Sequence, residues 1–443
     1  MFTLLIGKTL IFLLGLLNRG TSLPGDVALR MNKNIWKYFK ITDNVIAVTG
    51  SSGKGSTGKL LTQVLRNEGY NVITNAGSSN LDSAVLSLLI KNAKLNGNVT
   101  ADYIVLEVDE RYCKHVFPYV KPKHVIVTNI TRDQPPRQGN PDLVYAEIIK
   151  ALPKGVNLIL NGDDPYLRKF NINNEYSTTY FGISKTKYSY SKSRYDNLNI
   201  SYCPYCNTKL SYNFYHFEAT GDYYCPNCDF KRNDIKFEIS EVDYERYLIT
   251  LNNETYKLTE NMLYFIYNSL GVITISKLLG ISYASIKQAI EKEYNQYSHV
   301  TLDINDRKVE VLNNKAENAS TYNQSILYIN RFSNAKVLVI GWKEISRRYD
   351  YDDLSWLFDI DFESLDINQI EAVVTMGINA YDIASRLKYC GIADSKLKPF
   401  IEVSDATEYI KDKTVSDIYA ILNFDHMQPF INNMKEDNKW KKL

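Results

Sequence analysis

VIAVTGSSGKGSTGKLL, Val45 to Leu61, joins a run of branched apolar residues to a Gly/Ser-rich turn and then to an amphipathic helical pattern. This order predicts a strand, a tight turn and a helix whose first N–H groups surround a phosphate together with a lysine. Gly50, Gly53 and Lys54 occupy the positions of such a phosphate loop. The stretch therefore predicts a nucleotide site. The alternative is an ordinary Gly/Ser turn between strand and helix.

One residue departs from the general phosphate-loop pattern. The pattern has Ser or Thr directly after the lysine, because its hydroxyl helps to hold Mg²⁺. Gly55 stands at that position here. Ser56 stands one position after the one that the pattern requires, and Ser52 precedes the lysine. Either serine is a candidate ligand of the metal. Alternatively, the loop binds a nucleotide without a productive Mg²⁺.

Strand and helix patterns alternate along the chain around this loop. Further strands are predicted at 71–75, 103–109, 124–130 and 157–164, and helices at 57–69, 82–95 and 262–280. Such alternation is typical of an α/β fold with a doubly wound parallel sheet, in which ligands lie at the carboxyl ends of the strands. A second series of strands, at 308–314, 336–342, 372–378 and 418–424, predicts a further Rossmann-like α/β domain.

The predicted domains follow these patterns. We expect an N-terminal apolar helix and linker over 1–44, with Leu23–Gly25 in the linker. A central ATP-binding domain over 45–299 carries an insertion at about 200–232, and a C-terminal domain covers 300–443 with a loose polar tail. The 52 basic and 50 acidic side chains nearly cancel, which disfavours nucleic acid as a partner.

The apolar N-terminal segment, Phe2 to Leu17, is interrupted by Lys8. Its uninterrupted part is about half as long as a bilayer span requires. We therefore expect a helix that packs on the body of the protein or lies at a membrane surface. A cleaved signal peptide is the alternative, but no small-x-small cleavage site follows the segment.

Four of the six cysteines form two C-x-x-C pairs: Cys203 with Cys206, and Cys225 with Cys228, 18 residues apart. This spacing predicts a closed structural Zn²⁺ site of the ribbon type, which fits a reducing cytoplasm. A nucleic-acid-binding ribbon is the alternative, and it lacks a basic face.

Carboxylates follow one of the predicted strands. Glu107, Asp109 and Glu110 come at the end of YIVLEVDE, where they form either a Mg²⁺ site or a solvated loop. Asn129 follows the next strand in TNITRDQ, where a helix cap is the structural alternative. Asp163 and Asp164 in LNGDDP are expected to form a turn.

These motifs, in this order, resemble the Mur ligase superfamily, most closely its MurT-like members. The motifs that carry the resemblance are NRGTSLPG at 18–25, the phosphate loop, LEVDE at 106–110, TNITRDQ at 128–134, LNGDDP at 160–165, the four-cysteine ribbon, YNSL at 267–270, and DLSWLFDIDFE from Asp353 to Glu363. The ribbon and the last motif distinguish MurT-like members from other Mur ligases.

The resemblance implies an ATP-dependent amide ligase subunit that pairs with a GatD-like glutaminase. Such a subunit converts the α-carboxyl of D-glutamate in the lipid II stem peptide into an acyl phosphate, which ammonia from glutamine displaces. It implies a cytoplasmic protein, peripheral at the inner face of the membrane.

The resemblance also implies roles for single residues. Lys54 and the N–H groups around Gly53 match the positions that bind the β and γ phosphates, and Glu107 matches a Mg²⁺ ligand. Asn129 and Asn268 match positions of adenine contacts. Asp353 matches an aspartate that orients the histidine of the partner's Cys/His pair, and Glu107 and Asp353 are therefore the expected catalytic residues.

Several positions depart from the family pattern besides Gly55. Ser298 and His299 replace Gly-Arg, Asn314–Ala316 replaces Lys-Asn-Pro, Pro135–Asn140 keeps only the arginine and glycine of Met-Asp-Arg-Phe-Gly-Glu, and Phe265 replaces an asparagine. Each lost charge-assisted contact weakens transition-state binding by about 1.5 to 3 kcal/mol unless another group compensates. A catalytically degenerate scaffold or regulator that still binds a glutaminase is therefore the second hypothesis.

Overall fold

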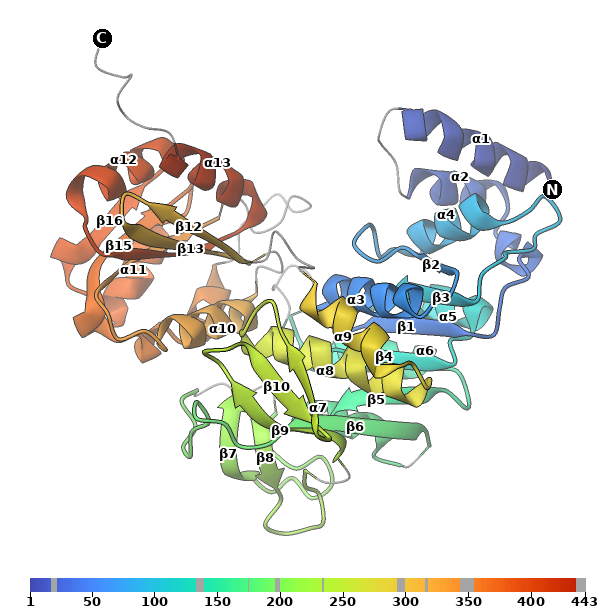
Figure 1. Ribbon diagram of the computed structural model, residues 1–443, viewed down its shortest axis with the longest axis horizontal. Coiled ribbons are helices and arrows are strands. Elements are labelled where there is room, and N and C mark those ends of the chain that lie inside the picture. Colours follow the sequence, from blue (N-terminus) through green and yellow to red (C-terminus); the bar gives the residue numbers. More distant parts are fainter. Residues whose placement is uncertain are drawn as a thin grey trace. The chain divides into compact units, whose positions relative to one another are not determined.

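The computed structural model describes most of the chain, which divides into two compact units. The described residues are 1–16, 22–132, 139–173, 175–195, 200–232, 235–292, 299–314, 318–342 and 354–435. The first unit comprises Met1–Thr131, Pro141–Ser193 and Leu198–Tyr294, and the second comprises Arg132–Asn140, Arg194–Asn197 and Asn295–Leu443. Figure 1 shows the elements of both.

A nine-stranded sheet in the order β11-β10-β9-β6-β5-β4-β1-β3-β2 is the centre of the first unit. Its strands are β1 (Val45–Thr49), β2 (Val72–Thr74), β3 (Tyr103–Glu107), β4 (His124–Val127), β5 (Asn157–Asn161), β6 (Ser177–Ile183), β9 (Ile235–Asp243), β10 (Leu248–Leu251) and β11 (Glu254–Lys257). The strands from β2 to β9 pair in parallel, and β10 and β11 are antiparallel. Every residue of β1 is buried, which explains the unbroken apolar run in the sequence.

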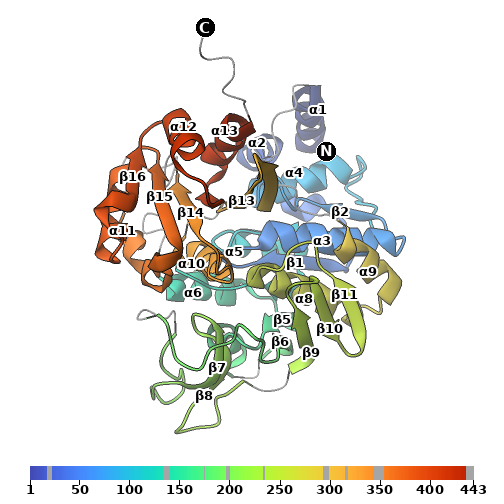
Figure 2. The ribbon, with the colours of Figure 1, turned by 60° about the vertical axis from the view of Figure 1, so that its left-hand side comes forward.

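Helices accompany this sheet, as the alternating pattern predicts. They are α1 (Phe2–Leu16), α2 (Leu23–Met31), η1 (Ile35–Tyr38), α3 (Lys54–Asn67), α4 (Asp82–Asn92), α5 (Cys113–Val120), α6 (Pro141–Ala151), α7 (Pro165–Arg168), η3 (Lys169–Asn171), α8 (Leu263–Leu278) and α9 (Tyr283–Glu291). The helices α3, α8 and α9 contact one another, and α5 contacts both α4 and α6. A separate antiparallel hairpin of β7 (Ser211–Phe217) and β8 (Thr220–Tyr224) lies below the sheet in Figures 1 and 2.

The N-terminal helices belong to the first unit, where α1 and α2 pack on α4 (Figure 1). Of the two expectations for the apolar helix, packing on the body agrees with the full burial of Leu4, and a place at a membrane surface stays a prediction. The expectation of a linker at Leu23–Gly25 is wrong, because these residues form the first turn of α2. The N–H of Gly25 donates to Ser87 Oγ at 2.8 Å, and a Cβ at Gly25 would lie 1.8 Å from the carbonyl oxygen of Ser83. The absence of a side chain at Gly25 therefore lets α2 approach α4.

Among the described residues, no helix is both long and apolar enough to cross a membrane.

The second unit contains a six-stranded sheet in the order β12-β13-β17-β14-β15-β16. Its strands are β12 (His299–Ile304), β13 (Arg307–Asn313), β14 (Lys336–Gly341), β15 (Ile370–Met376), β16 (Leu397–Phe400) and β17 (Asp417–Leu422). Its helices are α10 (Ala319–Ile329), η4 (Ser355–Asp359), η5 (Phe362–Ser364), η6 (Ile367–Gln369), α11 (Ala380–Tyr389), η7 (Asp394–Lys396), α12 (Val403–Lys413) and α13 (Phe424–Lys435). The chain after Phe430, expected to be loose, stays helical as far as Lys435.

A buried glutamate joins the first two strands of this second sheet. Glu310, which is 1% exposed, accepts a hydrogen bond from the ring of His299 and an ion pair from Lys308 at 2.7 Å. Burial raises the pKa of Glu310, but the hydrogen bonds and charges of His299 and Lys308 outweigh this effect and bring the pKa to about 2. His299 stands where the family pattern has an arginine, and its ring is engaged within the sheet to which it belongs.

We predict that Glu310→Gln destabilises the second unit at neutral pH by about 1 to 3 kcal/mol, because it removes a buried, paired charge. The pKa of an unfolded glutamate is about 4.3. The native value is lower, so the stabilisation is present above the unfolded value and declines as the pH falls from there towards about 2. The urea dependence of hydrogen exchange in β12 and β13 at pH 7 and at pH 3 measures both effects. The exposed Glu408→Gln is the matched control. A loss of equal size at both pH values would contradict the assignment.

Candidate nucleotide and zinc sites

The predicted phosphate loop lies at a topological switch point of the nine-stranded sheet. The strand β1 pairs with β3 on one side and with β4 on the other. The order of the strands therefore reverses next to the carboxyl end of β1. This is where parallel α/β sheets bind ligands. The loop follows β1, Glu107 ends β3, and Asn129 follows β4. The order of the strands thus gathers residues that are far apart in the sequence.

Two glycines give the loop its shape. Gly50 has φ +125° and Gly53 has φ +80°, in the region that disfavours side chains. A Cβ at Gly50 would lie 2.4 Å from Thr128 Oγ1, and a Cβ at Gly53 would lie 2.7 Å from Asn268 Oδ1. Only glycine fits at either position. The helix α3 begins directly afterwards at Lys54, which leaves the N–H groups of its first turn available to an anion.

Residues that follow β4 hold the phosphate loop by hydrogen bonds. The N–H of Ser52 donates to Asn129 Oδ1 at 3.0 Å, and Asn129 Nδ2 donates to the carbonyl oxygen of Ser52 at 3.1 Å. The hydroxyl of Thr128 also donates to that carbonyl oxygen, at 2.6 Å. The structure therefore shows Asn129 supporting the loop, and Asn268 lies beside Gly53. Their adenine contacts stay predictions.

Lys54 carries a largely buried positive charge at the start of α3, with 11% of its side chain exposed. Its ammonium group donates to the carbonyl oxygens of Gly50 and Ser51, and to Glu110 Oε2 at 3.3 Å. Burial lowers the pKa of Lys54, but the nearby carboxylates, chiefly Glu110, outweigh it and raise the pKa. The side chain is therefore a fixed cation, as phosphate binding requires.

The three carboxylates after β3 have different partners. Asp109 is paired with Arg111 at 2.9 Å, and Glu110 with Lys54. Glu107 Oε2 accepts from the N–H of Gly77 at 2.9 Å, which is a neutral donor. Carboxylate oxygens are ligands that Mg²⁺ prefers, and the role of Glu107 as a Mg²⁺ ligand stays a prediction.

The structure gives a physical reason for Gly55, which the sequence did not reveal. A Cβ at Gly55 would lie 3.2 Å from Glu107 Oε2, tighter than most real contacts of a Cβ atom. The missing side chain thus leaves the Glu107 carboxylate room beside the first turn of α3. Ser52 Oγ already bonds to Asn129 at 3.2 Å, and the choice between Ser52 and Ser56 as a metal ligand stays a prediction. Asp353 lies outside the described residues.

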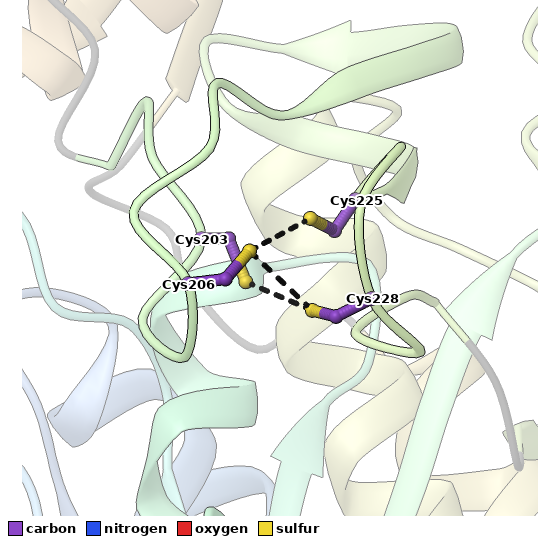
Figure 3. Close-up of side chains that lie close together, drawn as sticks. All are labelled: Cys203, Cys206, Cys225 and Cys228. Carbon is purple, nitrogen blue, oxygen red and sulfur yellow. Dashed lines mark hydrogen bonds between the residues drawn. The ribbon is translucent and has the colours of Figure 1, made fainter.

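The four cysteines predicted to bind zinc come together. Their ligand atoms lie within 4.8 Å of one another, and Figure 3 shows the four sulfurs pointing inward from two turns. Three Sγ–Sγ distances are 3.4, 3.4 and 3.7 Å, too long for a disulfide. Tetrahedral Zn²⁺ with four thiolates requires a separation of about 3.8 Å. The geometry fits a closed site with no open coordination position.

The zinc hairpin has a small apolar core, in which Cys203, Leu210, Tyr223, Cys225 and Phe230 pack together. So few buried side chains contribute little folding free energy, and structural zinc commonly supplies the remainder in modules of this kind. A metal held by the four cysteines would therefore supply much of the folding free energy of this hairpin.

Two family descriptions match the chain: Mur ligase middle domain over residues 48–228, and MurT ligase C-terminal over residues 316–427. Two curated relatives carry the name lipid II isoglutaminyl synthase (glutamine-hydrolyzing) subunit MurT. The relative from Staphylococcus aureus is 28% identical over 94% of this chain and 93% of its own. The relative from Streptococcus pneumoniae is 27% identical over 96% and 95%. This chain is thus similar to MurT over nearly its whole length.

Solved structures share the fold of this MurT-like chain. A pseudomurein peptide ligase type C from Methanothermus fervidus has a TM-score of 0.67 at 18% identity, covering 91% of this chain and 81% of that chain. A MurF ligase from Thermotoga maritima, solved in complex with ADP, has a TM-score of 0.57 at 16% identity, covering 93% and 84%. The predicted Mur-ligase-like α/β fold is confirmed.

A buried ionic contact connects the zinc hairpin of the MurT-like chain to α8. Asp163 is fully buried and accepts from Arg232 Nε at 2.6 Å, directly after the hairpin, and from the Tyr267 hydroxyl at 2.8 Å. Tyr267 immediately precedes Asn268 on α8. The turn predicted at LNGDDP is confirmed, and Asp163 lies in it. The burial of Asp163 was not predicted, because nothing in LNGDDP distinguishes a buried acid from a solvated one.

We predict one tightly bound Zn²⁺ per chain, and loss of that zinc in Cys225→Ser. Hydrogen exchange in 200–232 should accelerate at least tenfold in the variant, because the hairpin loses its main source of folding free energy. Native mass spectrometry and exchange measurements check both results. Cys390→Ser makes the same substitution at a thiol of the second unit and should keep the zinc. Full protection of the hairpin after chelation would contradict a structural role.

Proposed function

We propose that this chain is the ATP-dependent amide ligase subunit of an enzyme that amidates lipid II. It activates the α-carboxyl of D-glutamate in the stem peptide as an acyl phosphate, and ammonia from a GatD-like glutaminase displaces the phosphate. The observation that carries the proposal is the convergence of the Gly50–Lys54 loop with Glu107 at the switch point. The named relatives, which match nearly the whole chain, support the choice of reaction.

The proposed chemistry needs positioning and charge neutralisation. A carboxylate is a poor electrophile, and phosphorylation gives it a leaving group. In-line transfer then depends on cations placed around the phosphates. Lys54 supplies one such cation, and Mg²⁺ held by Glu107 would supply another. The N–H groups of α3 bind the phosphates from the third side.

The partner and the location follow from the proposed substrate. Ammonia must come from a glutaminase, and we assign to Asp353 the role of orienting the partner's histidine. Lipid II is lipid-linked, so we place the reaction at the cytoplasmic face of the membrane.

A catalytically degenerate scaffold is the second candidate. The observation that favours it is the engagement of His299 with Glu310 where the family pattern has an arginine. This candidate predicts a stable complex with a glutaminase but no ATP turnover.

We expect the chain with its glutaminase to hydrolyse ATP only when glutamine and a stem-peptide acceptor are both present. Lys54→Ala should lower this turnover by about 10² to 10³-fold, because it removes a preorganised charge at the phosphates. Lys150→Ala, on the exposed end of α6, is the matched control. Complex formation without any ATP consumption by the wild-type chain would reject the ligase and support the scaffold.

Gly55→Ala tests the space beside Glu107. Its added methyl group should displace the carboxylate and weaken Mg²⁺-dependent ATP binding by about tenfold, the loss of one charge-assisted contact. Calorimetry with and without Mg²⁺ measures the effect. Gly15→Ala, where a Cβ would meet nothing within 4 Å, is the control. Equal binding by Gly55→Ala and the wild type would refute this role of Gly55.

A further inference from the structure

The helix α1 buries only one side. Leu4 is 0% exposed, and a Cβ at Gly7 would lie 3.0 Å from Ile90 of α4. Lys8, the only charged side chain of α1, donates to the carbonyl oxygen of Lys91 in the last turn of α4, at 3.3 Å. Its charge is thus directed to a helix C-terminus, where a cation is favourable.

The opposite side of α1 is apolar and exposed. Its residues, which we call the apolar face, are Phe2, Leu5, Phe12, Leu13 and Leu16, with exposures of 71, 52, 67, 50 and 70%. Separations of three, four, seven and eleven residues place them along one side of a helix. A run of large apolar side chains on a protein surface marks an interaction site.

The chain around the apolar face is basic. Residues 1–40 contain six Lys or Arg and one acidic residue, a formal charge of 6 − 1 = +5, whereas the whole chain carries +2. In the same unit, Arg30, Lys33, Lys114 and His115 line a cavity of about 420 Å³ together with one acidic residue, Asp82. Arg30 and Lys114 are paired with Asp26 and Glu147, so the excess of positive charge comes from the segment as a whole. This excess of positive charge complements an anionic surface.

We infer that the apolar face docks on an anionic phospholipid bilayer, with α1 lying in the plane of the interface and the basic residues near the lipid phosphates. As described, α1 has 15 residues and extends about 22 Å, which is shorter than a hydrocarbon core of about 30 Å and fits a helix in the plane of the interface. A second copy is disfavoured, since pairing two such faces would bring two basic segments together. An apolar helix with basic neighbours is typical of interfacial binding. The link to a lipid-linked substrate rests on the proposed function, whereas membrane contact needs no turnover.

Vesicle flotation of the full chain tests this surface. We expect binding to vesicles of phosphatidylcholine mixed with phosphatidylglycerol, and at least tenfold weaker binding to phosphatidylcholine alone. Phe12→Glu with Leu13→Glu should weaken binding to the mixed vesicles at least tenfold, because charges oppose insertion. The matched control is Tyr389→Glu with Val415→Glu, which adds the same charges at exposed positions of the second unit, 83 and 82% exposed. This control should bind like the wild type.

Three results would overturn the inference: no flotation of the wild-type chain, equal flotation of the Phe12/Leu13 variant, or a concentration-dependent dimer in ultracentrifugation that this variant abolishes. Turnover separates the inference from the proposed function. The Phe12/Leu13 variant should keep its activity on a soluble stem-peptide acceptor and lose it on a lipid-linked acceptor in vesicles. Vesicle binding without turnover on any acceptor would reject the proposed function and leave the membrane surface standing.

Discussion

The buried ammonium group of Lys54 constrains the candidate nucleotide site more than any other group. An unpaired charge at this depth would be costly, so the chain must always supply it with negative partners. Glu110 and the carbonyl oxygens of Gly50 and Ser51 are those partners in this structure. A bound triphosphate would take over the same role. The charge of Lys54 therefore holds the loop in shape before a ligand binds. This preorganises the loop for a phosphate, which can then pair with the same charge.

The three carboxylates near Lys54 have different partners. Glu110 compensates Lys54, Asp109 is occupied by Arg111, and Glu107 is held by neutral donors. A carboxylate whose hydrogen-bond donors are neutral has its oxygens available to a metal, and Glu107 also helps to raise the pKa of Lys54 through its charge. This arrangement also explains Gly55, because the lack of a side chain at that position leaves room for the Glu107 carboxylate beside α3.

The sequence predicted features that depend on local pattern and failed where burial decides. The branched run of β1, the glycines of the loop and the spacing of the four cysteines each carry a local physical signal, and the structure has the corresponding elements. The helix at Leu23–Gly25 was missed because Pro and Gly read as a linker. The close packing of Gly25 on Ser83 is a tertiary effect that no local pattern contains. The turn at Asp163 was predicted, but its burial was not, since its partners Arg232 and Tyr267 lie far along the chain.

The departures from the family pattern need not all act on the same function. His299 replaces an arginine, yet its ring makes a hydrogen bond with the buried Glu310. That substitution contributes to the stability of the second sheet. Gly55 instead acts beside Glu107, at the phosphate loop. The two departures therefore have separate physical causes: one is a side-chain contact within the second sheet, and the other is the space that Glu107 occupies beside α3.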